Sequence, residues 1–347
     1  MTRLRDIVAA ASAVLAVACG AVEPEAPPQD VAPQGEAAIP PVGNIERFDR
    51  RIDSLVPADA VIEKLADGFN FIEGPVWDRQ NGRLLFSDVR GNQIYQWTEA
   101  DGVRTFIDPV FDGDRTGKRS ISSNGLTLDA EGRLIICEHG HRRISRLEAD
   151  GTRSVVVERY DGGQLNSPND AVYGSDGSLY FTDPPYGLEG LEESPDRELD
   201  FNGIYRLRPD GGLVLLVRDQ SRPNGIALSP DESILYVANS DDANKVWMAY
   251  DLDESGASNG RVFYDANDET AAGAADGMKV DVAGNLFATG PGGVWVLAPD
   301  GTHLGTISTG EVTANVAWGN DGRTLYLTSS TSLYRIELTT EGQIPGP

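Results

Sequence analysis

Oxygen-bearing side chains recur at the start of six similar segments of the chain. Each segment opens an apolar run with an acidic or amide residue, and these residues are Glu73, Asn124, Asn169, Asn224, Asp276 and Asn315. They recur every roughly 40–55 residues, the length of one propeller blade. Asn and Asp before Gly are also common turn residues, so no single segment is diagnostic. The six segments together are more specific than any one of them, and their opening residues indicate a shared site.

Four of these residues form a set of donors that suits a hard cation. The set has two carboxylates and two amides, on Glu73, Asn169, Asn224 and Asp276. Such oxygen donors are the ligands that Ca²⁺ prefers, although another divalent cation fits the same donor types. Two negative charges would offset those of a dication. Four protein ligands would leave positions for water and substrate, so the set predicts a metal site that is open to chemistry.

The residues between these openings predict short β-strands that position the donors. In the first five units three further β-rich runs follow the opening, and in the sixth unit two follow, with Val, Ile, Leu, Tyr and Phe in the runs and Asp-Gly or Asn-Gly in several of the gaps. This pattern predicts an all-β fold, a six-bladed β-propeller with four-stranded blades. The sixth unit lacks a fourth strand, which residues 60–66 are expected to supply, closing the ring. A β-sandwich with coincidental spacing is the alternative.

A propeller would bring further polar residues to the same place. The starts of inner strands face the central channel, so the four donors are expected to converge there, with Asn124 as their neighbour. His139 and Tyr186 follow the second strands of units two and three, where the chain returns to the same face. We expect Tyr186 to line the pocket. His139 fits a substrate contact and a structural hydrogen bond equally well.

Composition and missing motifs exclude several other functions. A formal net charge of −25 disfavours nucleic acids and anionic lipid surfaces, which need clusters of Lys and Arg. The sequence contains no CxxC, HExxH or Walker motif. Residues 112–117 and 251–256 begin like EF-hand loops, but Ser123 and Val262 stand where a bidentate Glu is needed, which predicts solvated turns. Cys137 lies in the apolar run LIICEH and is expected in the core.

The N-terminal region has the composition of an export signal followed by a tether. Residues 1–19 combine two arginines with an apolar stretch and end in LAVAC, which resembles a bacterial lipobox with Cys19 as the lipidated residue. Residues 20–55 are expected to form a disordered tether, and residues 56–342 the propeller. These features predict a lipoprotein of the bacterial cell envelope, periplasmic or anchored in the outer membrane. No other membrane contact and no protein partner is predicted.

Several motifs together resemble a known family. EGPVWD, SNGLTLDAEGRL, LNSPNDAVYGSDGSLYFTDPPYG, PNGIALSPDE and ADGMKVDVAGNL are similar to the gluconolactonase branch of the family that contains regucalcin (senescence marker protein). The resemblance runs from about residue 63 to residue 336. It implies a six-bladed propeller with a divalent cation in its channel, in a family where many members hydrolyse sugar lactones. Some animal relatives carry Arg where this chain has Ser167. The lactone that those relatives prefer therefore cannot be assigned to this chain.

The resemblance also implies roles for individual residues. Glu73, Asn224 and Asp276 fall at its metal-ligand positions. Asn169 falls at the position that touches metal or substrate, and Asp276 is the proposed base. The implied reaction is attack of water on a lactone carbonyl polarised by the cation. Other hydrolases on the same metal propeller, such as a phosphotriesterase or an aryl-ester lactonase, remain alternatives, as does a non-catalytic calcium-binding propeller.

Overall fold

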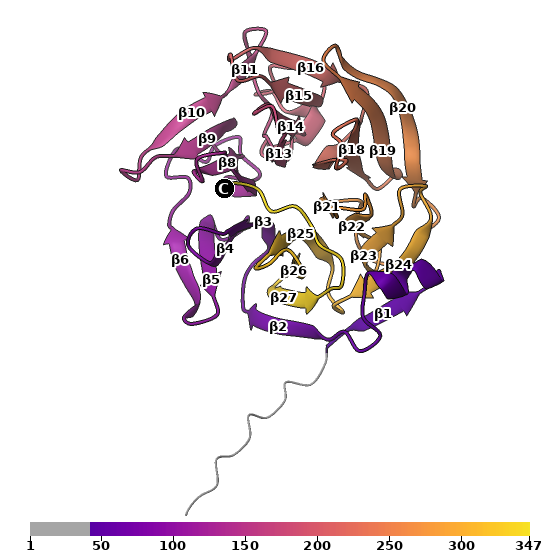
Figure 1. Cartoon of the computed structure of the whole chain (residues 1–347). Helices are drawn as coiled ribbons and strands as arrows, with labels where there is room; N and C mark the ends of the chain where they lie inside the picture. Colours follow the sequence, from indigo (N-terminus) through magenta and orange to yellow (C-terminus); the bar gives the residue numbers. More distant parts are fainter. Residues whose placement is uncertain (1–41) are drawn as a thin grey trace, which may run out of the picture. The chain divides into compact units, whose positions relative to one another are not determined.

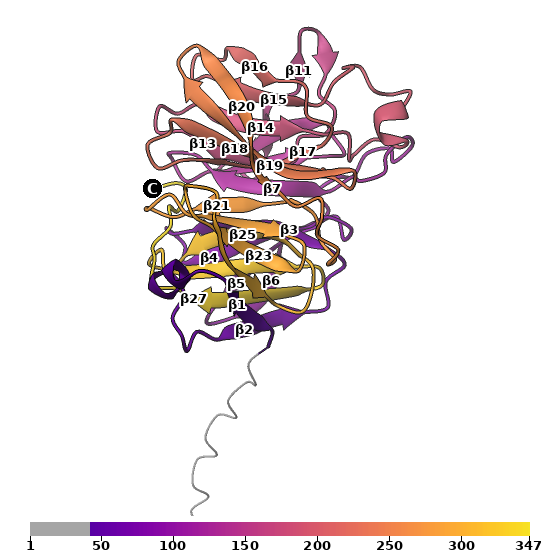
Figure 2. The ribbon, with the colours of Figure 1, turned by 90° about the vertical axis from the view of Figure 1, so that its right-hand side faces the viewer.

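The computed structural model describes residues 42–347, which form six blade sheets around a central axis and one separate two-stranded hairpin (Figure 1). Neighbouring strands within each sheet are antiparallel. The inner strand of each sheet contacts the inner strands of the two sheets beside it, so the six sheets form a closed ring. Seen from the side, the inner strands β7, β21 and β25 cross the middle of the ring (Figure 2). The predicted all-β six-bladed propeller is therefore confirmed.

The first three blades follow one another along the chain. Blade one contains β3 (Ile72–Asp78), β4 (Arg83–Asp88), β5 (Gln93–Thr98) and β6 (Gly102–Ile107). Blade two contains β7 (Ser123–Leu128), β8 (Leu134–Glu138), β9 (Arg143–Leu147) and β10 (Arg153–Val157). Blade three contains β13 (Ala171–Tyr173), β14 (Leu179–Asp183), β15 (Gly203–Leu207) and β16 (Leu213–Val217). A short hairpin precedes blade three, β11 (Arg159–Tyr160) with β12 (Gly163–Gln164), and a 3₁₀ turn lies within it, η2 (Leu191–Glu193).

The remaining blades complete the ring. Blade four contains β17 (Pro223–Leu228), β18 (Ile234–Asp241), β19 (Asn244–Asp253) and β20 (Gly256–Asp265). Blade five contains β21 (Met278–Val280), β22 (Leu286–Gly290), β23 (Gly293–Leu297) and β24 (His303–Ser308). Blade six takes three strands from the C-terminal region, β25 (Thr313–Gly319), β26 (Thr324–Ser329) and β27 (Ser332–Glu337). Its fourth strand is β2 (Ile62–Asp67), which pairs with β27, so the predicted closure by an N-terminal strand is confirmed.

The expected tether of residues 20–55 is too long. β1 (Asn44–Arg47) pairs with β24 and makes blade five five-stranded. A 3₁₀ turn follows, η1 (Arg50–Ser54), in which the carboxylate of Asp49 accepts a hydrogen bond from the Arg51 amide and Ile52 is fully buried. β1 is mostly exposed and only four residues long, so it has no apolar pattern to reveal it. Cys19 and the predicted signal lie outside the described residues.

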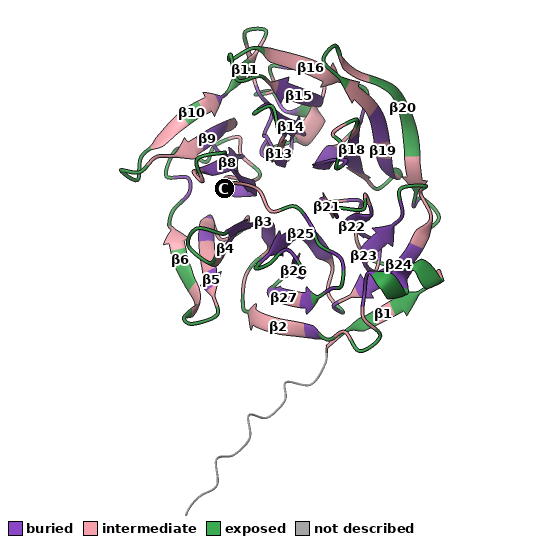
Figure 3. Cartoon of the chain, in the orientation of Figure 1, coloured by how far each residue is buried: buried purple, intermediate pink, exposed green. Residues whose placement is uncertain are grey.

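The hydrophobic core lies between neighbouring blades. Trp77 of blade one stacks on Tyr326 of blade six with ring centroids 5.4 Å apart. Cys137 of blade two packs in one cluster with Phe181 and Tyr205 of blade three, which confirms it as a core residue. Buried residues accordingly concentrate on the inner strands, whereas exposed residues lie at the outer edge (Figure 3). Within residues 42–347, no helix is long and apolar enough to span a membrane.

The closing strand provides a test of the architecture. Ile62 in β2 is 3% exposed and packs in the core between blades five and six, whereas its neighbour Val61 is 46% exposed. Ile62→Ala should lower the free energy of unfolding by about 2–5 kcal/mol, since it leaves a cavity in the core. Val61→Ala should change it by less than about 0.5 kcal/mol. Equal effects of the two substitutions in chemical denaturation would contradict closure by β2.

Candidate functional site

Seven predicted site residues line one cavity of about 600 Å³ at the centre of the ring. They come from the first four blades and the start of the fifth, and they are Glu73, Asn124, His139, Asn169, Tyr186, Asn224 and Asp276. Glu73, Asn124 and Asn224 lie on the inner strands β3, β7 and β17. Asn169 and Asp276 lie just before the inner strands β13 and β21. The fold therefore brings together residues that are up to about 200 positions apart in sequence.

A glycine after most of these donors lets the blades approach closely. Gly74 follows Glu73 with a φ of +55°, and a Cβ there would lie 2.1 Å from the Asn124 carbonyl oxygen. A Cβ on Gly225, after Asn224, would lie 2.2 Å from the Asp276 carbonyl oxygen. Neither position has space for a side chain. The Glu-Gly and Asn-Gly pairs are therefore packing requirements at the axis and not only turn signals.

The sixth blade differs from the repeat pattern. The Ala314 carbonyl accepts a hydrogen bond from the Gly277 amide at 2.8 Å, just as the Asn169 carbonyl accepts one from Gly125 at 2.7 Å. Ala314 thus stands at the ring position of the sixth blade, and Asn315 stands where other blades have Gly. Asn315 does not line the cavity. Its side chain fills the space beside Gly277.

Three buried carboxylates lie close together at the axis. Burial raises the pKa of Glu73 to about 7, and the nearby Asp170 raises it further. Burial also raises the pKa of Asp276 well above its usual range, with Glu73 and Asp170 contributing in the same direction. The pKa of Asp170 is raised by burial and lowered by Lys279. Without a further positive charge, these groups cannot all be ionised at neutral pH.

Several buried polar atoms in the cavity have no hydrogen-bond partner among the described residues. They are Asn124 Oδ1, His139 Nε2, Asn169 Oδ1, Tyr186 Oη and Asp276 Oδ1. Buried polar atoms are normally paired, so such a cluster indicates a place that binds a ligand. Asn224 differs, because its Oδ1 accepts a hydrogen bond from Asn169 Nδ2 and its Nδ2 donates to Ser240 Oγ at 2.9 Å.

This set of groups fits a divalent cation. Two carboxylates, Glu73 and Asp276, and two amides, Asn169 and Asn224, border one cavity, as the sequence predicts. Their oxygens are hard donors, and a bound cation would offset the burial that raises the pKa values of the two carboxyls. Residues 42–347 contain no cluster of three or more His, Cys, Asp or Glu that could hold a metal, and the donor set in this cavity combines carboxylate with amide oxygens.

His139 and Tyr186 lie on the cavity wall. His139 follows β8, and its Nδ1 lies 2.9 Å from Ser120 Oγ while its Nε2 is unpaired. The ring therefore has both the structural hydrogen bond and the free cavity-facing nitrogen that the sequence left as alternatives. Burial lowers the pKa of His139 to about 4, so the ring is neutral at pH 7. Burial raises the pKa of Tyr186, which keeps its hydroxyl protonated.

Ser167 supports the segment that carries Tyr186. Its Oγ donates to the Pro184 carbonyl at 2.6 Å and accepts from the Gly187 amide at 2.8 Å. Ser167 does not line the cavity. Ser167, which stands where some animal relatives have Arg, therefore fixes a loop in this chain. Other side chains form the wall of the cavity.

Sequence reasoning missed several residues of the cavity. Ser240 and Ser120 line it, as do four basic residues from two loops, namely Arg90, Arg115, Lys118 and Arg119. The segment 112–117, predicted only as a solvated turn, belongs to the β6–β7 loop and contributes Arg115 to the cavity. Segment 251–256 does form the predicted turn, between β19 and β20. The missed side chains lie in loops, where the strand repeat gives no signal.

A second, larger cavity does not contain the predicted site. It has a volume of about 1090 Å³ and lies at the other ends of the inner strands, with Leu128, Tyr173, Lys279 and Ile344 among its lining residues. None of the seven predicted residues borders it. Unpaired buried polar atoms and shifted carboxylate pKa values instead mark the smaller cavity, which we take as the functional site.

Comparisons with known proteins agree with this geometry. The chain is 40% identical to a gluconolactonase of Zymomonas mobilis over 312 residues, 87% of this chain and 88% of that protein. It is 26% identical to pentonolactonase XacC of Haloferax volcanii over 266 residues, 74% of this chain and 81% of that protein. A solved structure from Xanthomonas campestris, described as a gluconolactonase, superposes with a TM-score of 0.75 at 31% identity, covering 88% of this chain and 99% of that one.

The match to a family covers most of the propeller. Residues 71–331 match the family described as SMP-30/Gluconolactonase/LRE-like region. This range begins just before Glu73 and contains all seven predicted residues of the cavity. The resemblance that the sequence motifs indicate is therefore confirmed, and the chain belongs to the SMP-30/gluconolactonase family.

Proposed function

We propose that this protein hydrolyses a sugar lactone at the central cavity, with the help of a divalent cation. The observation that carries the proposal is the convergence of two carboxylates and several unpaired buried polar groups in one cavity. Relatives named gluconolactonase and pentonolactonase support the choice of a lactone as substrate. We call the side of the cavity that Glu73, Asn169, Asn224 and Asp276 form its floor, and the remaining lining its wall. The floor suits a cation, and the wall suits a ligand with several hydroxyl groups.

Glu73, Asn169, Asn224 and Asp276 would hold the cation, for which Ca²⁺ is the first candidate. When bound, such an ion polarises an ester carbonyl and lowers the pKa of a nearby water. Asn169 Oδ1 and Asp276 Oδ1 have no other partner among the described residues and are available as ligands. The hydrogen bond from Asn169 to Asn224 holds these two amide side chains against each other on the cavity floor.

The chain's own residues then supply the base and the orientation of the substrate. Asp276 is proposed to accept the proton of the attacking water, since its carboxylate borders the cavity and its Oδ1 has no hydrogen-bond partner among the described residues. His139 is a weaker candidate, because burial lowers its pKa to about 4. His139 Nε2, Tyr186 Oη and Asn124 Oδ1 are proposed to hydrogen-bond to sugar hydroxyls and hold the ester over the base.

The lining of the cavity favours a sugar over an apolar ester. Its wall carries amide, hydroxyl and imidazole groups on Asn124, Ser120, Ser240, Tyr186 and His139. A phosphotriesterase or aryl-ester lactonase would gain little from these groups and would leave several of them unpaired, at a cost to binding. A polyhydroxylated lactone satisfies them.

The first test concerns the cation. Glu73→Gln removes one of the two charges that offset a dication while nearly preserving the size of the side chain. The affinity for Ca²⁺ in calorimetry should fall at least about tenfold, which corresponds to ~1.4 kcal/mol. Added Ca²⁺ should also raise the Tm of the variant less than that of the wild type. As a control, Asp251→Asn on β19, the third strand of blade four, should leave both quantities unchanged. Undiminished binding by Glu73→Gln would place the cation elsewhere.

The second test separates proton transfer from metal binding. Asp276→Asn keeps an oxygen donor but cannot accept a proton, so turnover of a lactone at saturating cation should fall about 10²–10⁴-fold. His139→Gln should cost less, because the neutral imidazole is proposed to orient the substrate. If Asp276→Asn is nearly as active as the wild type at saturating cation, another group activates the water.

We also propose that the protein is a lipoprotein of the cell envelope, anchored through Cys19. Its support is the sequence of residues 1–19 alone. Acyl chains on the N-terminal residue would hold the propeller at a membrane surface without any spanning segment. Cys19→Ser should move the protein from the membrane pellet to the soluble fraction after cell lysis, and a variant that still pellets with membranes would exclude the anchor.

A further inference from the structure

Four basic side chains border the candidate site. Arg90 follows β4, whereas Arg115, Lys118 and Arg119 belong to the β6–β7 loop, and all four line the central cavity. We call them the basic rim. The acidic residues that line the same cavity are Glu73 and Asp276. Basic side chains therefore outnumber acidic ones here, although the whole chain has 54 acidic residues against 29 Lys and Arg.

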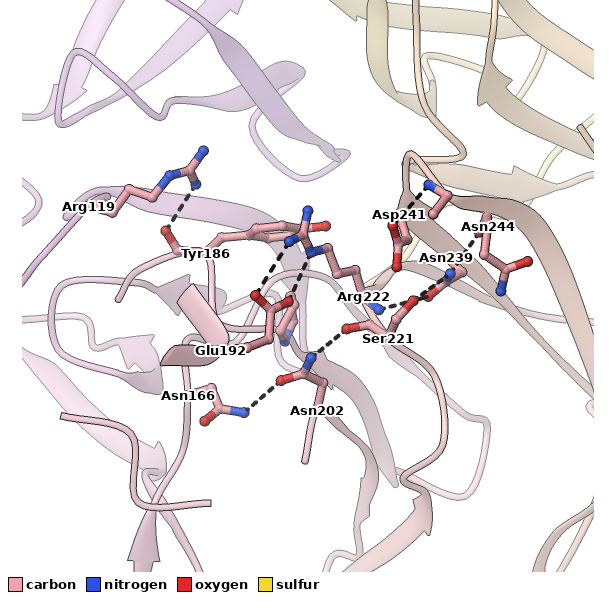
Figure 4. A network of polar contacts seen from close by, with 12 residues as sticks. Arg119, Asn166, Tyr186, Glu192, Asn202, Ser221, Arg222, Asn239, Asp241 and Asn244 are labelled. Atoms are coloured by element: carbon pink, nitrogen blue, oxygen red, sulfur yellow. Dashed lines mark hydrogen bonds and ion pairs between the residues drawn. The ribbon is translucent and has the colours of Figure 1, made fainter. Parts of the chain in front are cut away.

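The basic rim forms no salt bridge within the described residues, although Lys118 also lines a second cavity together with Asp196 and Glu198. Nearby Arg222 is held by Glu192 at 2.9 Å, whereas Arg119 makes a single long contact, 3.4 Å, to the Tyr186 carbonyl (Figure 4). The Arg90 guanidinium lies over the Phe71 ring, and the Lys118 ammonium over the Phe111 ring. No described residue forms a salt bridge with any of the four. The charges of Arg90, Arg115 and Arg119 therefore remain available to a ligand in the central cavity.

The loop that carries three of these residues is fixed against blade three. The Arg119 amide donates to the Gly187 carbonyl at 3.0 Å, and the Glu189 amide donates to the Gly117 carbonyl at 2.9 Å. Lys118 and Leu188 form an isolated β-bridge between these hydrogen bonds. Tyr186, a wall residue of the cavity, directly precedes the paired segment. The basic rim is thus held next to the wall by backbone pairing.

From this arrangement we propose that the preferred substrate is an anionic sugar lactone, with a carboxylate or phosphate on the carbon far from the ester. This inference rests on the proposed function for the ester end. A dication on the floor would be offset by Glu73 and Asp276, which leaves four positive charges on the cavity lining. The ester then lies at the floor while the anionic group contacts the basic rim. Cationic side chains without partners attract an anion from solution and hold it by charge-assisted hydrogen bonds.

A neutral lactone would not use the basic rim. Its hydroxyls can be satisfied by Asn124, Tyr186 and the two serines of the wall. Hydrolysis of any lactone creates a carboxylate at the floor, where the ester was. The basic rim lies on the loops and not at the floor, so binding of this product carboxylate does not explain it. An anionic group at the opposite end of the substrate accounts for both features of the cavity.

The test compares substrates that differ only in charge. Wild-type protein with saturating Ca²⁺ is assayed with glucono-1,5-lactone, its 6-phosphate and a glucaric acid lactone. We expect kcat/KM for at least one anionic lactone to exceed that of the neutral lactone by about tenfold or more. In the variant with Arg115→Gln, Lys118→Gln and Arg119→Gln together, this ratio should fall about tenfold. Which of the two anionic lactones is preferred distinguishes a phosphate from a carboxylate.

A matched control removes an arginine outside the cavity. Arg79 is exposed, has no salt bridge among the described residues, and follows the far end of β3. Arg79→Gln should leave the substrate ratio unchanged. A wild-type ratio near one, or a ratio that the triple variant does not change, would overturn the proposal.

A binding experiment keeps this proposal separate from the proposed reaction. Calorimetry compares gluconate with 6-phosphogluconate and with glucarate, on wild-type and triple-variant protein, at low and at about 0.3 M salt. Tighter binding of the more highly charged acids, lost in the variant, supports the basic rim even if no lactone is hydrolysed. If the acids bind in this way but no lactone is hydrolysed, the lactonase proposal is wrong and the proposal for the basic rim stands. Equal binding of all three acids overturns the anionic substrate, whatever the turnover of the neutral lactone.

Discussion

The burial of like charges at the axis of the ring is the constraint on which the site depends. Glu73, Asp170 and Asp276 are all buried where the inner strands meet, and each has a raised pKa. Burying several carboxylates together costs several kcal/mol unless charges or hydrogen bonds offset it. Lys279 and the Asn315 amide lower the pKa values of Glu73 and Asp170 and so provide part of the compensation. The rest is what a cation would supply from the cavity.

The fold holds this arrangement by linking each blade to the next. Hydroxyls on the second strands donate to carbonyls of the following blade, as in Ser87 to Asn124 at 2.7 Å and Thr182 to Asn224 at 2.6 Å. Thr289 makes the same link to Ala314 at 2.9 Å. These bonds fix the backbone beside the site residues. Because the donors come from different blades, their geometry also depends on the closure of the ring by β2.

Much of the fold and the centre of the site could be predicted from the sequence. The strand repeat has a physical origin in the inward apolar residues of each blade, so it located the blades and the ends of their inner strands. Glu73, Asn169, Asn224 and Asp276 stand at those ends and therefore meet. The role of Asp170 was not predicted, because it stands one residue after a donor, where four other blades have Gly. Its burial depends on contacts from blades that are distant in sequence.

Other features carry no periodic signal. The basic rim lies on loops of unequal length, and the β6–β7 loop, which carries three of its residues, is held at the cavity by the pairing of residues 117–119 with residues 187–189. β1 and η1 were assigned to the tether because they are short and mostly exposed. In both cases the position is determined by tertiary contacts, which the local sequence pattern does not encode.

The most direct test of a cation site built on buried carboxylates is the number of protons released when the cation binds. Calorimetric titration of the metal-stripped protein with Ca²⁺ at pH 6, in two buffers with different heats of ionisation, gives this number. Because the pKa of Glu73 is raised to about 7, its carboxyl is largely protonated at pH 6 before binding, and burial also raises the pKa of Asp276. The account predicts saturable binding with release of about one proton or more per ion, and an affinity that rises with pH toward 7. Binding with no proton release, or no saturable binding, would contradict it.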